Sequence, residues 1–376
     1  MGNHSEVGHF TDDGGLHERG VYWLNGFVPL AYQLKAAGIS VLYPKCSHKG
    51  RLKEADGPEL PPRNRNGAGP VPLGPVNPMA QVRIFIDAIL ASVNATDGWI
   101  GPGDRPTVSD SGHPPNGGIY WGRSNAIFAL IHYAEAENTL GKNPAEFERV
   151  ATVVKNYFLC IKDMLAITPL EMWSASRWVD MALSVAWTIS NSSPTEMEMV
   201  ALMELGGVLR QQGTDWGAHY AGIGKGELSN SQQLRHNVNN AQALKWSAVE
   251  HLFTGNASLR NHGRQDMANM DSMFGIPTGM FNGDEMIPKP PSRNPSRGIE
   301  TCGVVEAMFS YTTLGAVHGD VQFFDRAERI AFNALPAAWA SRRGGDMWNH
   351  PYLQSVNEVQ AIESDPVSTC RCRASV

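Results

Sequence analysis

The sequence predicts an all-α protein. About ten segments of the 376-residue chain repeat apolar side chains at helical spacing, and no run alternates apolar and polar residues as a half-buried strand does. Short and medium loops between these segments favour antiparallel helical hairpins, arranged either as a solenoid or as a closed α/α toroid. No repeat of about 34 or about 40 residues occurs, which argues against the common solenoids. A toroid of six hairpins needs about twelve helices, so we expect an (α/α)6 barrel that lacks about one hairpin.

The chain is expected to begin with one helix and a long irregular segment. Residues 17–34 place apolar side chains such as Val21 and Leu24 on one helical face, interrupted only by Pro29. Residues 35–78 are rich in proline, glycine and arginine without a sustained period, which predicts a long loop or a disordered insert. The predicted divisions are residues 1–34 (N-terminal segment and first barrel helix), 35–78 (insert), 79–361 (the rest of the barrel) and 362–376 (an atypical tail).

Helical order returns at residue 79 and continues along most of the chain. In residues 79–94, Val82 and Ile86 lie on one face, and in residues 144–166 Val150 and its neighbours do the same. Further helices are predicted over residues 122–138, 175–190, 196–212, 233–253, 258–273, 303–314 and 320–341.

Composition narrows the classes of partner. The net charge of -6 provides no basic surface for nucleic acid, whereas ten tryptophans and nine tyrosines suit an uncharged ligand such as a sugar, although most are expected in the core. The N-terminus lacks a basic segment followed by an apolar run, and no stretch approaches about eighteen apolar residues. We therefore expect no export signal and no membrane association, with a cytoplasmic or unspecified location. The oligomeric state is left open.

Residues 280–306 are the most chemically suggestive stretch. This span collects the side chains of Asp284, Glu285, Glu300, Cys302 and Glu306. Its prolines interrupt any helix, so the acidic pair and the Glu-Thr-Cys triplet lie on opposite sides of an irregular loop. Zinc accepts thiolate and carboxylate together, and a desolvated carboxyl can act as a proton donor. By themselves, the same residues also fit a solvated turn and a buried cysteine. The five cysteines of the chain are too scattered for a disulfide framework.

Nine segments, taken in order, resemble a known family. They are YWLNGFVPLAYQL, DGWIGP, WGRSNAIFALIHYAEAE, RWVDMALSVAW, RHNVNNAQALK, GMFNGDE, GIETCGVVEAMFS, FDRAERIAFNALPA and DMWNHPYLQSVNEV, and they cover most of residues 17–361. Together they resemble the catalytic domain of glycoside hydrolase family 127, the β-L-arabinofuranosidases built on an (α/α)6 barrel. The resemblance implies a carbohydrate substrate and a zinc ion.

The resemblance also implies roles for particular residues. Glu285 matches the acid/base, and Glu300 and Cys302 match a zinc-binding pair. The family completes its zinc site with two adjacent cysteines, one of which is the nucleophile, in a segment beyond the last matching piece. Here Cys370 and Cys372 are the available cysteines, but they are one residue apart, so we expect the nucleophile position to be altered or missing and the family domain to be truncated.

The implied sugar pocket draws on five further residues. His236 matches a pocket histidine, and Arg123 is the nearest residue to a second one. Arg177 and Asp180 lie three apart, which fits either pocket contacts or an ordinary helical ion pair. Trp348 is a loop aromatic expected near the binding face.

Three functions remain open from the sequence. The first is a retaining, exo-acting β-L-arabinofuranosidase with a glutamate acid/base and a zinc-bound cysteine nucleophile. The second is an inactive sugar-binding or unstable fragment that lacks the nucleophile. The third, an inverting hydrolase, would pair Glu285 with another carboxylate such as Glu306. The sugar and its linkage stay undetermined.

Overall fold

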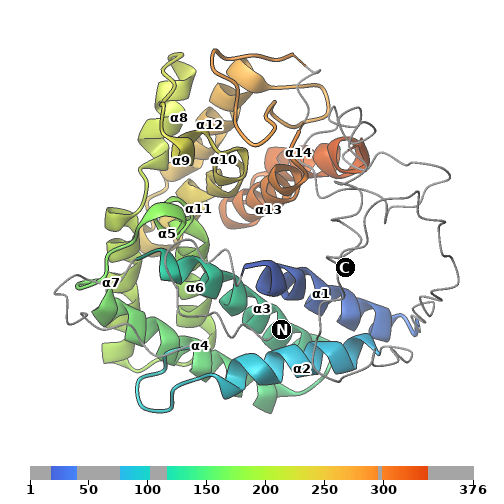
Figure 1. The fold of residues 1–376 in the computed structure, drawn as a ribbon, viewed down its shortest axis with the longest axis vertical. Helices are drawn as coiled ribbons and strands as arrows, with labels where there is room; N and C mark the ends of the chain where they lie inside the picture. The colour runs from blue at the N-terminus through green and yellow to red at the C-terminus, as the bar shows by residue number, and fades with distance from the viewer. Residues whose placement is uncertain (1–17, 40–76, 102–116, 295–298, 338–376) are drawn as a thin grey trace, which may run out of the picture.

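The computed structural model describes residues 18–39, 77–101, 117–294 and 299–337 (Figure 1). Within these ranges the chain is helical, and backbone pairing outside the helices is limited to isolated bridges. The all-α prediction is therefore confirmed for this part of the chain. The predictions for the segment 40–76 and for the tail 362–376 lie outside it.

The N-terminal half contains seven α-helices, most of them close to the predicted ranges. They are α1 (Glu18–Ala36), α2 (Pro78–Ala91), α3 (Tyr120–Thr139), α4 (Pro144–Met164), α5 (Met172–Ser176), α6 (Trp178–Asn191) and α7 (Glu196–Gln212), and the 3-10 turn η1 (Gly117–Ile119) precedes α3. Local chemistry explains several of their starts. The Asn77 side chain accepts from the Met79 amide with Pro78 at the first helical position, and Thr195 with Glu198 forms a capping box.

The C-terminal half is more broken than the periodicity predicted. It contains α8 (Trp216–Gly224), α9 (Gln232–Arg235), α10 (Asn237–Ala243), α11 (Trp246–Thr254), α12 (Leu259–Phe274), α13 (Thr301–His318), α14 (Val321–Arg329), the π-helical turn η3 (Ile330–Ala334) and α15 (Leu335–Ala337). The prediction of one helix over residues 233–253 was wrong, because His236 has an extended backbone and Lys245 departs from helical geometry. Helix α8 was not predicted, since its three glycines weaken the helical signal.

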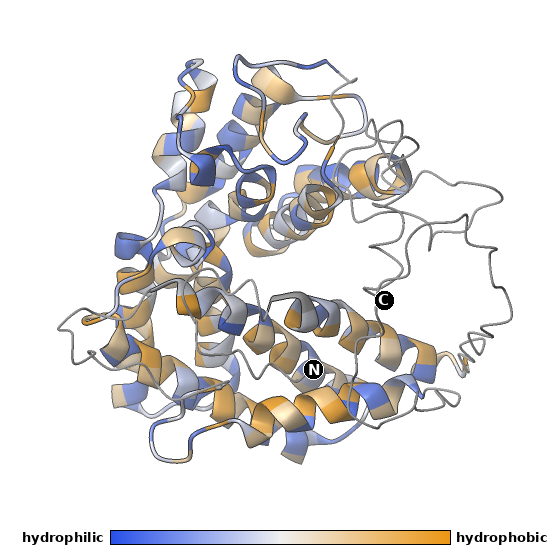
Figure 2. Cartoon of the chain, in the orientation of Figure 1, coloured by the Kyte–Doolittle hydropathy of each residue, from blue (hydrophilic) through white to orange (hydrophobic). Residues whose placement is uncertain are grey.

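The helices form an inner and an outer set that alternate along the chain. The inner helices α1, α3, α6, α11 and α13 each contact the next, and α2, α4, α7, α12 and α14 pack behind them. Figure 1 shows an arc with α1 and α2 at one end and α13 and α14 at the other. Helix α3 is buried almost all round, as an inner helix between neighbours must be. Figure 2 shows hydrophilic and hydrophobic residues side by side on most of the other helices.

The core follows the contacts between these two sets of helices. Leu24 and Val28 of α1 and Val82 and Ile86 of α2 are buried in one continuous apolar cluster with residues of the later helices. Among the helices described, none has both the length and the apolarity needed to cross a bilayer.

Candidate functional site

The loop between α12 and α13 is anchored on the break between α9 and α10. The Asn237 amide donates to the Glu285 carbonyl at 3.0 Å, and the Asn237 side chain donates to the Gly283 carbonyl at 2.9 Å. The Glu300 amide donates to the same Gly283 carbonyl at 3.0 Å. The absence of a side chain at Gly303 makes room for the Asn237 side chain, because a Cβ at position 303 would lie 2.8 Å from the Asn237 Nδ2. Asn237 thereby ties one side of the loop to α10, and the Gly283 carbonyl joins that side to Glu300 on the other.

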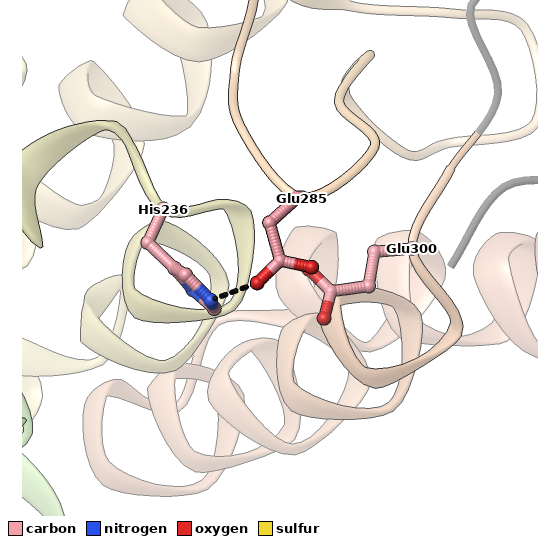
Figure 3. Close-up of side chains that lie close together, drawn as sticks. All are labelled: His236, Glu285 and Glu300. Carbon is pink, nitrogen blue, oxygen red and sulfur yellow. Dashed lines mark hydrogen bonds and ion pairs between the residues drawn. The ribbon is translucent and has the colours of Figure 1, made fainter. Parts of the chain in front are cut away.

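This anchoring brings three ligand-type side chains together. His236, Glu285 and Glu300 each offer an atom that could hold a metal ion, and these atoms all lie within 4.8 Å of one another. The Nε2 of His236 donates to the Oε1 of Glu285 at 3.1 Å. Figure 3 shows the Glu285 carboxylate between the His236 ring and the Glu300 carboxylate. The Glu285 side chain is 49% exposed and that of His236 only 7%, so the cluster is reached from the Glu285 side.

The two carboxyl groups have opposite pKa shifts. Burial, followed by repulsion from Glu285, raises the pKa of Glu300 to about 9. The hydrogen bond from His236 is the main cause that lowers the pKa of Glu285 below its ordinary value, and burial opposes it. Without a bound cation, the proton of this pair therefore resides on Glu300 at neutral pH.

Arg177 lies beside the cluster, between the rings of Trp121 and Trp173, which we call the aromatic frame. Its guanidinium donates to the hydroxyl of Tyr22 at 2.7 Å and to Oδ1 of Asn239 at 2.9 Å. The guanidinium carbon lies 4.6 Å from the ring centroid of Trp121 and 5.1 Å from that of Trp173. Such contacts hold a guanidinium rigidly and keep its charge near the carboxylates. Arg177 occupies the break between α5 and α6, which the predicted helix 175–190 did not contain.

A buried ion pair, formed by Asp180 and Lys245, lies between α6, α10 and α13. The Nζ of Lys245 lies 2.6 Å from Oδ1 of Asp180, and both side chains are buried. Gln242 donates to the other oxygen of Asp180, and Lys245 also donates to the Gln242 carbonyl at 2.7 Å. Burial is the largest cause raising the pKa of Asp180, and the charge of Lys245 acts against it. Asp180 is therefore part of a buried ion pair rather than an i,i+3 pair with Arg177.

The donor set fits a divalent cation. One imidazole and two carboxylates are ligands that zinc accepts, with bonds of about 2.0–2.2 Å. Atoms bound to one such ion lie at most about 4.2 Å apart, so the observed spread requires only small side-chain rotations. The Oε2 of Glu300 is buried, and no hydrogen-bond partner for it lies within the described ranges. A buried carboxylate oxygen in that state is what an absent cation would explain.

Cys302 lies at the start of α13, two residues after Glu300. It lies in the first turn of α13, partly exposed, and it does not join Glu300 in a group of three or more ligand atoms among the described residues. The reason is that residues two apart at a helix start point to different sides. The pairing of Glu300 with Cys302 at one metal stays a prediction.

Arg123 lies in a structural environment. Its guanidinium donates to the carbonyls of Ile100 at 2.8 Å and Ile119 at 2.9 Å, and it lies 4.1 Å from the centroid of Trp99. These contacts join the segment after α2 to the start of α3. A sugar contact for Arg123 stays a prediction. The remaining predicted site residues Cys370, Cys372 and Trp348 lie outside the described ranges.

Sequence reasoning missed several residues of the site. Tyr22, Trp173 and Asn239 all contact Arg177, and Lys245 pairs with Asp180. A signal existed only for Trp173, which precedes Arg177 by four residues and so shares its side of a helical turn. The other contacts join distant segments and have no local signature.

Comparison of the chain with protein-family models, with curated proteins and with solved structures gave no match. Function is therefore inferred from the site itself and from the resemblance of its segments.

Proposed function

We propose that the chain is a glycoside hydrolase whose catalytic centre is the cluster of His236, Glu285 and Glu300. One observation supports this most directly: two carboxyl groups from opposite sides of a loop meet within 4.8 Å, and their pKa values shift in opposite directions. Carboxyl pairs with separated pKa values divide acid and base roles between them. The aromatic frame of Arg177 beside them suits a sugar ring.

In the proposed reaction, Glu285 is the acid/base. Its carboxyl is half exposed, so it can reach a leaving glycosidic oxygen, and His236 holds it in place through Nε2. A bound sugar would remove water from the exposed half of Glu285 and raise its pKa toward that of a proton donor. His236 stays hydrogen-bonded to the Glu285 carboxylate after the proton has passed to the leaving oxygen.

Zinc is the cofactor we propose for this centre. Glu300 would hold it through its buried carboxylate together with Cys302, the ligand implied by the resemblance, which leaves Glu285 as the acid/base beside His236. Bound zinc keeps a cysteine thiol ionised at neutral pH and so supplies a nucleophile. In this proposal the substrate is a β-L-arabinofuranoside, the outcome is retention, and Cys370 or Cys372 is the nucleophile. The six-hairpin toroid belongs to the same proposal, and the alternation of inner and outer helices supports it.

A second mechanism is favoured by the pKa directions. If no zinc binds, Glu300 keeps its proton and serves as the general acid, while the ionised Glu285 serves as the nucleophile. Retaining enzymes of that type place their carboxyl groups about 5–5.5 Å apart, and one carboxylate oxygen of Glu285 lies within 4.8 Å of one of Glu300. Sensitivity to chelators distinguishes the two mechanisms.

The test combines zinc analysis with hydrolysis of p-nitrophenyl β-L-arabinofuranoside. We expect about one zinc per chain, activity that is lost after chelation, and loss of activity in Glu285→Gln. Glu148→Gln, which changes an exposed glutamate on α4, is the matched control and should leave activity intact. Activity that survives chelation would select the two-carboxylate mechanism. A folded protein that neither binds nor hydrolyses the glycoside would overturn the proposal.

A further inference from the structure

Glu306 lies on the inward face of α13, one turn beyond Cys302. Ser310, one further turn along, donates from its hydroxyl to the Ala241 carbonyl at 2.7 Å. Because residues four apart share a face, Glu306 points in the same direction as Ser310, toward α10 and the interior of the arc. Glu306 and Glu300 are separated by about 9 Å along the helix axis, a separation on the scale of one sugar unit.

The neighbours of Glu306 are already satisfied. Asp180 and Lys245 are buried and paired with each other, and Arg177 is held by Tyr22 and Asn239. Glu306 as a residue is partly exposed, and no hydrogen bond to its carboxyl is found within the described ranges. The Glu306 carboxyl can therefore accept a hydrogen bond from a ligand, whereas the charged groups around it already have partners.

The balance of positive and negative charges around Glu306 favours binding of an uncharged ligand. Two cations, Arg177 and Lys245, and one anion, Asp180, act on the carboxyl of Glu306, and its charge also acts on Tyr22. A cationic ligand would meet the two basic groups, and an anionic ligand would meet the two acids. Hydroxyl groups both donate and accept, so a polyhydroxy compound suits this balance. Burial raises the pKa of Glu306 to about 7, which lets the carboxyl either accept or donate near neutral pH.

We propose that Glu306 determines specificity by hydrogen-bonding a ring hydroxyl of the sugar unit whose glycosidic bond lies at Glu285. Trp173, partly exposed beside Arg177, provides the adjoining apolar surface, and the Tyr22 hydroxyl borders the same space. This inference rests on the proposed function and adds to it a residue that recognises a particular sugar hydroxyl. Glu306 has this role in addition to the acid/base group, and it need not transfer a proton.

The test measures binding of methyl β-L-arabinofuranoside and of its 2-deoxy and 3-deoxy analogues by calorimetry. Wild type, Glu306→Gln and the control Glu148→Gln are compared, and thermal melting confirms that each is folded. We expect Glu306→Gln to weaken binding of the parent glycoside about tenfold to a hundredfold, as for loss of a hydrogen bond to a charged group. We also expect one deoxy analogue to bind the variant and the wild type equally.

The outcomes separate this inference from the proposed function. If wild type binds the glycoside and Glu306→Gln binds it equally well, the role of Glu306 is overturned while the glycosidase proposal stands. If the substitution weakens the binding affinity by the same factor for the parent and for both analogues, Glu306 has a structural role. Its proposed role in recognising a sugar hydroxyl is then overturned as well. If the folded wild type binds none of the three, the proposed function and this inference fall together.

Discussion

The Nε2 of His236 lies 3.1 Å from the Oε1 of Glu285, although 49 positions separate the two residues in sequence. The contact depends on Asn237, which follows the extended backbone of His236 and binds the loop that carries Glu285. A histidine within a continuous helix over 233–253 would not be followed by an amide free to bind the Glu285 carbonyl. The break in the helix is therefore what builds the site.

The packing of Gly303 against Asn237 can be tested by adding one methyl group. Gly303→Ala would place a Cβ 2.8 Å from the Asn237 Nδ2 and push that side chain away from the loop. We expect a loss of about 1–3 kcal/mol in the free energy of unfolding, measured in urea, because overpacking displaces a buried hydrogen bond. The activity should fall with it, since Glu285 loses its support.

Gly207→Ala is the matched control for Gly303→Ala. Gly207 is in α7, and a Cβ added there would have no atom from outside its own helix segment within 4 Å. Alanine is the better helix former by about 1 kcal/mol, so this variant should be as stable as the wild type or more so. Equal effects of the two substitutions would contradict a specific role for the Gly303 contact.

Much of the fold was predictable, and the reason is local. Helical periodicity depends on residues three or four apart, so α1, α4 and α7 were found near their true bounds. The breaks at Arg177 and His236 were not, because distant partners are involved there: Tyr22 binds the Arg177 side chain, and Glu285 binds the His236 side chain and accepts from the Asn237 amide. Functional sites are where local preference and tertiary structure conflict.

The candidate site was predictable only in its residue types. His236, Glu285 and Glu300 were named from the resemblance, but their mutual proximity follows from the anchoring of the loop. The buried pair of Asp180 with Lys245 has no sequence signal, since Asp180 lies in α6 and Lys245 in the distant break between α10 and α11. The chemical type of a residue can be read from sequence, whereas its partner depends on the packing.

The metal-free protein should become less stable as pH rises. Glu300 has an ordinary pKa near 4.5 when unfolded and about 9 when folded, so the unfolded chain releases this proton first. Its stabilising contribution is complete below about pH 4.5 and declines until about pH 9. In the presence of a chelator, the free energy of unfolding of Glu300→Gln should fall by about 4 kcal/mol less than that of the wild type between pH 5 and pH 8. Urea unfolding at both pH values measures this, and parallel curves for the two proteins would refute it.

Zinc binding should release a proton at pH 7. Glu300 holds a proton there without metal, and a carboxylate must lose it to become a ligand. Calorimetric titration with zinc in buffers of different ionisation enthalpy should give about one proton released per ion from Glu300, in addition to the proton that a cysteine ligand releases. In Glu300→Gln we expect weaker binding and a smaller release. Tight binding without any proton release would exclude Glu300 as a ligand.

The buried pair of Lys245 with Asp180 should be essential for folding. Lys245→Met leaves Asp180 as an unpaired buried acid, which typically costs about 3–5 kcal/mol. Lys162→Met is the matched control, because the pair of Lys162 with Glu204 is on the surface and should contribute at most about 1 kcal/mol.

The cost of Lys245→Met should be smaller at pH 5 than at pH 8, since burial raises the pKa of Asp180 and protonation removes its charge. Urea unfolding of the three proteins at both pH values measures these differences. A cost that is the same at both pH values would mean that Lys245 stabilises the protein through packing rather than through its charge.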